Sequence, residues 1–175
     1  AYRLSEAEYT FNKVGVRALV AAERFKSSDY LGMVETLAPE LSGSKPGHLK
    51  SARLPSLEMA IKLGPAPRPG WINFDELAAR PCNNEVVEQR ARALNARDAI
   101  NIQFTSGTTG MPKGATLSHH NILNNGMFVG AAQRFTADDR LCIPVPLYHC
   151  FGMVMGVLAC LTHGAAMVFP GDAFA

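Results

Sequence analysis

Apolar and polar positions along the first 40 residues switch between a helical and a strand-like spacing. Residues 5–13 have the helical spacing and stop at Gly15, while residues 16–21 form a short β-type run. A second helix is expected over residues 30–37, because Pro39 follows and the residue before a proline disfavours helical geometry. A helix, a strand and a helix in this order are typical of an α/β protein.

Helix starts are indicated by short polar residues. Ser5 to Glu8 fit a capping box for the first helix, and Ser28–Asp29 precede the second. Ser118 is expected to cap a long helix that runs from His119 to about residue 134.

The middle of the chain has a different composition. Residues 39–70 contain six prolines and four glycines, which predicts a connecting loop interrupted by one strand at 57–63. Short helical patches follow at 74–79 and 86–94. The chain therefore divides into a helix–strand–helix part at about 1–40, a loop-rich connection at 41–97 and a last part at 98–175.

The last part predicts alternating strands and helices. Besides the helix after Ser118, we expect strands at 99–104, 140–145 and 165–169, a loop at 146–152 and a buried helix at 153–161. The fold class is α/β, a mostly parallel sheet flanked by helices, with strand 99–104 at its centre.

Composition excludes several classes of protein. The 175 residues are 47% hydrophobic with a net charge of +2, which argues against disorder and against a nucleic-acid partner. The longest apolar run, 150–161, is too short to cross a membrane, and residues 1–10 do not have the pattern of a secretory signal. The four cysteines form no CxxC pair and are expected to be reduced thiols, which favours the cytoplasm, with the mitochondrial matrix as the alternative.

Residues 105–114 carry the most specific chemistry. This segment, TSGTTGMPKG, holds four hydroxyls, three glycines and one lysine, and it follows a predicted strand. Glycines let successive N–H groups converge on an anion, hydroxyls add donors, and Lys113 adds a mobile positive charge. The pattern predicts a polyphosphate site, although a Ser/Thr/Gly-rich surface turn is the simpler alternative. A Walker A loop is excluded, because Lys113 precedes a glycine here instead of following one.

Three stretches resemble one known family. TSGTTGMPKG is similar to the phosphate loop of the adenylate-forming enzymes, which include acyl- and aryl-CoA synthetases, luciferases and peptide-synthetase adenylation domains. Residues 117–121 (LSHHN) resemble the helix start after that loop, and 146–152 (PLYHCFG) resemble the next motif. The opening YRLSEAEY is similar to fatty-acyl-CoA synthetases, so that the resemblance covers nearly the whole chain.

The resemblance implies a fold, an activity and site residues. The family activates a carboxylate with MgATP to an acyl-adenylate, and its CoA ligases then form a thioester with coenzyme A. By position, the ATP β- and γ-phosphates would be held by Thr105, Ser106, Gly107, Thr108, Thr109, Gly110 and Lys113. Lys113 and His149 would be catalytic, and Tyr148, His149 and Gly152 would bind the acid. His149 and Tyr148 could equally be structural. No protein-bound metal is expected, since Mg²⁺ would arrive with ATP.

Departures from the family's pattern indicate the class of substrate and how much of the enzyme this chain contains. Residues 153–158 contain no aspartate of the kind that holds an amino group in peptide-synthetase domains, which favours an uncharged acyl chain. Met153, Met155, Gly156 and Val157 could line its pocket or be ordinary core. The family's later signatures and C-terminal domain are missing, so we expect a fragment of the large N-terminal domain that is inactive alone. An aryl-CoA ligase, a luciferase-like enzyme and a noncatalytic module remain alternatives, and oligomeric state is open.

Overall fold

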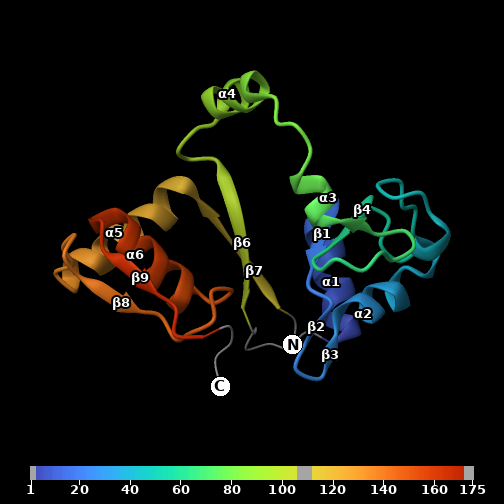
Figure 1. The fold of residues 1–175 in the computed structure, drawn as a ribbon, viewed down its shortest axis with the longest axis horizontal. Coiled ribbons are helices and arrows are strands. Elements are labelled where there is room, and N and C mark those ends of the chain that lie inside the picture. Colours follow the sequence, from blue (N-terminus) through green and yellow to red (C-terminus); the bar gives the residue numbers. More distant parts are fainter. Residues whose placement is uncertain (1–2, 106–111, 172–175) are drawn as a thin grey trace. The chain divides into compact units, whose positions relative to one another are not determined.

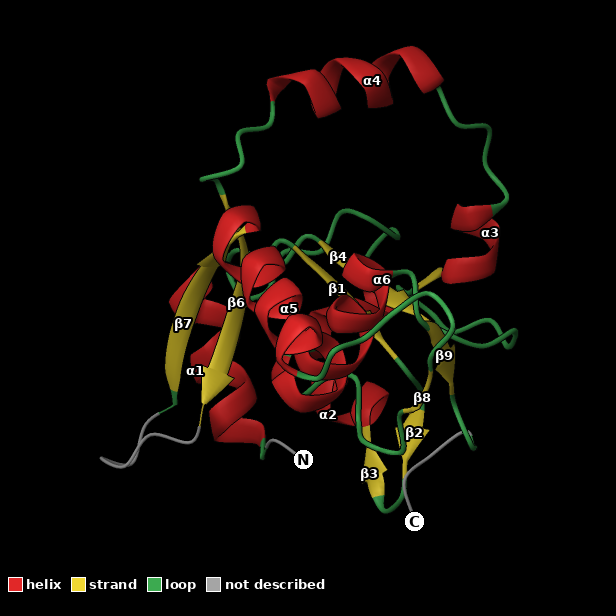
Figure 2. Cartoon of the chain, turned by 90° about the vertical axis from the view of Figure 1, so that its left-hand side faces the viewer, coloured by secondary structure: helices red, strands yellow, loops and turns green. Residues whose placement is uncertain are grey.

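The computed structural model describes residues 3–105 and 112–171, which fold into two compact units. The first unit contains the chain up to Val86 together with Pro112 and Lys113, and the second contains Val87–Thr105 and the residues from Gly114 onward. Figure 1 shows the elements of each unit in sequence colours, and Figure 2 shows their secondary structure.

The first unit is built on a parallel sheet of three short strands, in the order β1–β4–β5. β1 (Ala18–Ala21) and β5 (Ile72–Asn73) both run parallel to β4 (Met59–Lys62), with Ala18 opposite Met59 and Ile61 opposite Ile72. The expected strands at 16–21 and 57–63 are confirmed with shorter bounds.

Two helices precede the loop-rich connection and pack on this unit's core. α1 (Leu4–Val14) ends at Gly15, whose φ of 62° is the left-handed geometry that glycine adopts easily. α2 (Tyr30–Leu37) begins where the Asp29 carboxylate accepts a hydrogen bond from Gly32 N at 3.0 Å. The core combines α1, α2 and connection residues, of which the most buried are Leu31, Leu37, Ala38, Leu41, Leu54, Leu57 and Ala60.

The capping box expected at Ser5 is wrong by two residues. The helix begins at Leu4 with Arg3 as its cap residue, and the Glu6 carboxylate accepts a hydrogen bond from Arg3 N at 2.9 Å. Glu6 can reach back only to the residue three positions before it, so its carboxylate selects Arg3.

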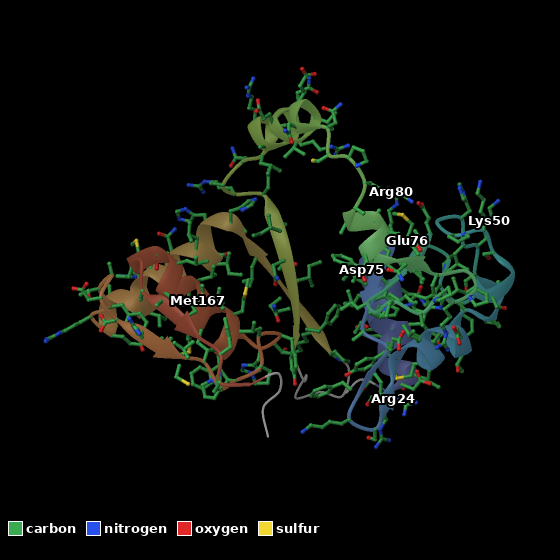
Figure 3. All side chains as sticks on the ribbon, in the orientation of Figure 1. Arg24, Lys50, Asp75, Glu76, Arg80 and Met167 are labelled. Atoms are coloured by element: carbon green, nitrogen blue, oxygen red, sulfur yellow. The ribbon has the colours of Figure 1, made fainter. Side chains whose placement is uncertain are left out.

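The remaining elements of the first unit are short. The hairpin strands β2 (Arg24–Phe25) and β3 (Ser28–Asp29) were not expected. A 3₁₀ turn, η1 (Pro39–Gly43), follows α2, and α3 (Phe74–Ala78) begins at Asn73, whose side chain accepts from Asp75 N. Side chains of both charges surround this unit, among them the labelled Arg24, Lys50, Asp75, Glu76 and Arg80 (Figure 3).

α4 (Asn84–Ala93) is exposed along its whole length, as its charged sequence predicts. The second unit then contains β6 (Ala99–Thr105) and β7 (Lys113–Ser118), which lie side by side as a two-stranded sheet (Figures 1 and 2). Strand 99–104 is therefore not central among the described residues: β7 is its one neighbour, and Ile100 and Ile102 remain exposed.

The rest of the second unit joins a parallel strand pair to packed helices. β8 (Arg140–Cys142) runs parallel to β9 (Ala166–Val168), with Leu141 opposite Met167. Between them, a π-helix, η2 (Phe151–Leu158), continues into α6 (Ala159–His163), which ends at Gly164. The expected helix at 153–161 is confirmed but begins earlier, inside the segment expected as a loop.

Glycines let the long helix α5 (His119–Ala132) approach η2 and α6 closely. A Cβ on Gly126 would lie 2.6 Å from Leu158 Cβ, and one on Gly130 would lie 2.5 Å from the His163 ring and 3.0 Å from Ala159 O. The two glycines are four residues apart and share one face of the helix. They fix the distance between α5 and the helix that begins at the PLYHCFG motif.

No helix among the described residues is long and apolar enough to span a membrane. The four cysteines are free thiols, and only Cys160 is buried; desolvation raises the pKa of its thiol.

Candidate active site

The predicted phosphate segment joins β6 to β7. Thr105 is the last residue of β6 and Lys113 is the first of β7, and both are exposed. Thr105, Lys113 and Gly114 thus belong to strands, although all three were expected in the loop. Ser106, Gly107, Thr108, Thr109 and Gly110 lie outside the described residues, and their phosphate-binding role stays a prediction.

Gly114 has a structural reason for being glycine. A Cβ there would lie 2.9 Å from Ile102 Cγ2 and 3.4 Å from the Phe104 ring. The third glycine of the motif therefore lets β7 pack closely against β6, apart from any contact with a phosphate. Ser118 then caps α5, as expected, by accepting a hydrogen bond from Asn121 N at 3.3 Å.

The PLYHCFG motif forms one turn that holds Tyr148, His149 and Gly152 together. His149 N donates to Pro146 O at 3.2 Å, which closes the turn, and Met153 N donates to His149 O at 3.0 Å, which starts the helix. Tyr148 has 77% of its surface exposed, and the His149 side chain is also exposed. The turn thus presents an aromatic ring and an imidazole to whatever occupies the space beside it.

The His149 ring is held from one side. Its Nδ1 lies 3.1 Å from Phe151 N and 3.7 Å from Cys150 Sγ. A main-chain N–H can only donate, so Nδ1 is the acceptor. This fixes the orientation of the ring relative to the helix.

The turn can close because Gly152 has no side chain. It is buried, and a Cβ would meet the Pro146 carbonyl group, with the carbonyl carbon at 2.9 Å and Val145 O at 3.1 Å. These neighbours are main-chain atoms, which cannot rotate away. Gly152, predicted to bind the acid, therefore also has a packing role in this turn.

The first residues of the helix after the turn alternate between exposed and buried. Phe151, Met153 and Met155 are exposed, whereas Val154 and Gly156 are buried, and a Cβ on Gly156 would lie 3.1 Å from Ile143. Exposed large apolar side chains on one helix are suited to an uncharged organic chain. Met153 and Met155 thus fit the expected acyl pocket better than Gly156 does.

Two buried polar groups, one on β6 and one at the start of α5, were not singled out by the sequence. Asn101 Oδ1 on β6 and His119 Nε2 at the start of α5 are buried and have no hydrogen-bond partner among the described residues. Buried polar atoms usually have a partner, so both are candidates for functional contacts. No sequence signal could have found them, because burial of a single atom depends on the tertiary packing.

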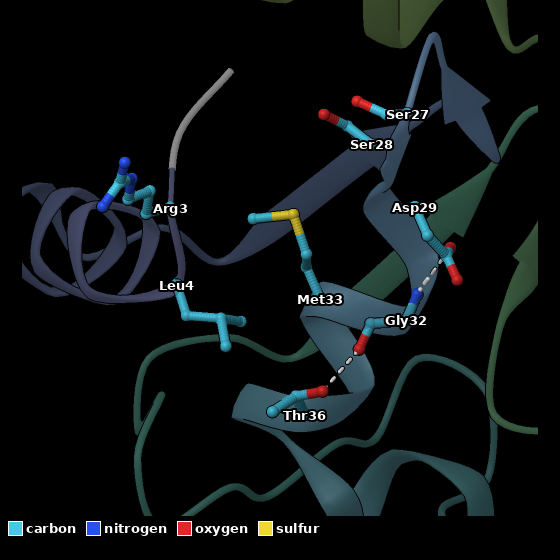
Figure 4. Close-up of a pocket in the computed structure, with 8 residues that line it drawn as sticks. All are labelled: Arg3, Leu4, Ser27, Ser28, Asp29, Gly32, Met33 and Thr36. Carbon is cyan, nitrogen blue, oxygen red and sulfur yellow. Dashed lines mark hydrogen bonds between the residues drawn. The ribbon is translucent and has the colours of Figure 1, made fainter.

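A hollow in the first unit contains none of the predicted site residues in its lining. It has a volume of about 560 Å³ and is lined by Arg3, Leu4, Ser27, Ser28, Asp29, Gly32, Met33 and Thr36 (Figure 4). Asp29 accepts from Gly32 N, and Thr36 Oγ1 donates to Gly32 O at 2.8 Å, so these polar groups serve α2 itself. Within residues 3–105 and 112–171, no three His, Cys, Asp or Glu side chains gather as metal ligands.

Comparison with known proteins places the chain in a family. A family model described as "AMP-binding enzyme" matches residues 1–175. The chain is 44% identical to the mouse medium-chain acyl-CoA ligase ACSF2, mitochondrial, over 99% of its own length and 29% of the relative's. It is 40% identical to the putative acyl-CoA synthetase YngI of Bacillus subtilis (strain 168), over 95% of this chain and 31% of that protein.

Solved structures agree on the fold. The anthranilate CoA ligase AuaEII in complex with anthranoyl-AMP matches with a TM-score of 0.73 at 21% identity, over 98% of this chain and 29% of that one. ATP-bound MatB from Rhodopseudomonas palustris matches with a TM-score of 0.65 at 24% identity, over 100% and 29%. The chain thus spans under a third of the length of these proteins. Its α/β fold, its motifs and its relatives agree that the chain belongs to the AMP-binding enzymes, the adenylate-forming family that includes the acyl-CoA ligases.

Proposed function

We propose that the whole protein activates a carboxylic acid with MgATP and transfers the acyl group to coenzyme A. The observation that carries the proposal is sequence identity of 40–44% to acyl-CoA ligases over nearly all of this chain. The carboxylate would attack the ATP α-phosphorus and release pyrophosphate, and the CoA thiol would then displace AMP. Residues 98–175 would supply the phosphate loop and part of the acid site, and the remaining parts would lie outside this chain.

Different described residues suit the phosphate side and the acid side of the proposed reaction. Lys113 is exposed at the start of β7, where its ammonium group could follow the charge that develops on the leaving pyrophosphate. The Thr105 hydroxyl could donate a hydrogen bond to the same phosphates. Tyr148 and His149 are exposed in one turn, where they could contact the acid.

The acid itself is proposed to be a fatty acid of medium length. ACSF2 is named a medium-chain ligase, and Phe151, Met153 and Met155 offer exposed apolar surface directly after His149. An aryl acid is the alternative within the same chemistry. We place the protein in the cytoplasm, with the mitochondrial matrix as the alternative, since ACSF2 is named as mitochondrial.

Product analysis of the whole protein tests this proposal. MgATP is incubated with a panel of straight-chain acids and benzoates, with and without CoA, and AMP, pyrophosphate and thioester are measured. We expect acid-dependent pyrophosphate in both cases, AMP and thioester in amounts equal to the pyrophosphate only when CoA is present, and the fastest turnover with medium-chain acids. Formation of ADP and phosphate, or ATP cleavage that no acid stimulates, would contradict the proposal.

A further inference from the structure

Lys62, the last residue of β4, is a lysine inside the first unit, with 1% of its surface exposed. A lysine is almost never buried this far unless its charge is paired. Its Nζ donates to Gly64 O at 2.7 Å and to Glu23 Oε1 at 3.3 Å. The Glu23 side chain is half exposed, so the ammonium group is the buried end of this ion pair and the carboxylate is the end that water reaches.

The ion pair lies where the three parallel strands of the first unit end. Glu23 follows β1, Lys62 ends β4 and Asn73 ends β5. Asn73 Nδ2 donates to the same Gly64 carbonyl at 3.0 Å, while Asn73 Oδ1 caps α3. Gly64 has a φ of 97°, and a Cβ there would lie 3.2 Å from Glu23 Oε1, so a side chain would be strained and would crowd the carboxylate. One polar network thus joins the carboxyl ends of β1, β4 and β5.

Glu23 also closes the base of the β2–β3 hairpin. Its main-chain oxygen accepts from Tyr30 N at 3.1 Å, and Tyr30 is the first residue of α2. The hairpin strands between these two residues are two residues long each, with Arg24 opposite Asp29. A two-stranded hairpin of this length has little stability of its own, so its position depends on what holds its base.

We propose that Lys62 is an ionic latch: its buried ammonium group holds the Glu23 carboxylate, and through Glu23 it holds the base of the β2–β3 hairpin against the sheet. Release of the latch lets the hairpin open while the sheet and α2 stay folded. Ser27, Ser28 and Asp29 line the hollow described above, so the latch also positions one wall of that hollow (Figure 4). All of these residues belong to the first unit, and the latch does not depend on the proposed reaction.

Two substitutions remove the two ends of the latch. Lys62→Met keeps most of the buried volume without the ammonium group, and the half-exposed Glu23 can then be hydrated. Glu23→Ala removes the carboxylate and leaves Gly64 O as the acceptor for Lys62. Glu58→Ala is the matched control, because Glu58 pairs with Arg17 at the opposite end of β1 and β4.

The readout is hydrogen exchange of the Tyr30 amide in the whole protein, compared with the Ala38 amide at the C-terminal end of α2. We expect Lys62→Met to speed exchange at Tyr30 by about 10-fold, as for the loss of one hydrogen bond to a charged group, and to leave Ala38 unchanged. Glu23→Ala alone should have an effect of the same size. Added to Lys62→Met, it should speed exchange by less than about 2-fold more, because its partner is already absent. Glu58→Ala should change neither amide.

Three results would overturn the latch. Exchange at the wild-type rate at Tyr30 in Lys62→Met would show that the ammonium group does not hold the hairpin. Independent effects that multiply to about 100-fold in the double variant would show that Glu23 does not act through Lys62. Equal acceleration at Tyr30 and Ala38, or failure of Lys62→Met to fold, would show that Lys62 supports the whole unit instead of the hairpin.

Discussion

Replacement of Gly152 by alanine should damage the acid side of the site through the main chain. The new Cβ would lie 2.9 Å from the Pro146 carbonyl carbon and 3.1 Å from Val145 O, whereas ordinary contacts begin at 3.4 Å. Pro146 O would lie closer still, so the turn must open by about 1 Å, since main-chain atoms cannot rotate out of the way. His149 N donates to Pro146 O in this turn, so the imidazole moves with it.

The size of the effect follows from that displacement. Overpacking of this kind costs about 1–3 kcal/mol of the free energy of unfolding. A misplacement of about 1 Å at a reacting group costs about 100-fold in rate, so a shift of this size should slow the reaction by about 100-fold. The loss should appear in adenylate formation with the carboxylic acid, because His149 faces the acid in the proposed reaction.

The assay compares Gly152→Ala with Gly43→Ala in the whole protein. Gly43 is exposed at the end of η1, and a Cβ there would meet nothing within 4 Å, so the control should change stability by less than about 0.5 kcal/mol. Urea denaturation gives the free energy of unfolding, and acid-dependent pyrophosphate exchange gives the rate. Wild-type stability and rate for Gly152→Ala would refute the closed turn.

Two further predictions concern stability, both measured by urea denaturation. Hydrogen bonds from Arg68 and, to a smaller extent, from Trp71 lower the pKa of Glu35 below its usual value. The ionised carboxylate therefore stabilises the folded protein at every pH above the pKa of Glu35 in the unfolded chain. This stabilisation of about 0.5–1 kcal/mol is lost as the pH falls through the lower pKa of the folded state. Glu35→Gln should therefore be less stable than wild type at pH 7 and should lose less stability between pH 7 and pH 3; an equal loss in both would contradict this. Gly130→Ala should lower the free energy of unfolding by about 1–3 kcal/mol, because the new Cβ would lie 2.5 Å from the His163 ring. Adding His163→Ala should recover part of this loss. Strictly additive effects of the two substitutions would show that the two side chains do not meet.

Local signals predicted much of the fold. α2 and α5 begin at the predicted caps, Asp29 and Ser118, because a short polar side chain binds N–H groups two or three residues ahead wherever the chain is helical. Gly15 ends α1 for a similarly local reason, its left-handed φ. The motif residues Tyr148, His149 and Gly152 were expected to act together, and one turn holds all three.

Tertiary pairing explains what the sequence did not predict. β7 was not expected, and its first two residues, Lys113 and Gly114, were placed in the loop, whereas the missing Cβ of Gly114 is what admits Ile102 and Phe104. The β-branched residues of 99–104 indicate a strand but carry no information about which strands pair with it. The prediction that this strand is central in the sheet was therefore wrong. The helix after PLYHCFG begins inside the motif, where His149 Nδ1 accepts a hydrogen bond from Phe151 N and none of the usual cap residues marks the start.

The role of residues 105–114 is the central claim, and the two half-reactions of Lys113→Ala test it most directly. Lys113 is exposed, so its loss should change stability by less than about 0.5 kcal/mol. Adenylate formation from ATP and acid should slow by about 10- to 1,000-fold, because a charge that stabilises the departing pyrophosphate is removed. Thioester formation from preformed acyl-adenylate should match wild type, because pyrophosphate has already left. Equal slowing of both steps, or slowing of thioester formation alone, would contradict the assignment of this segment to the ATP phosphates.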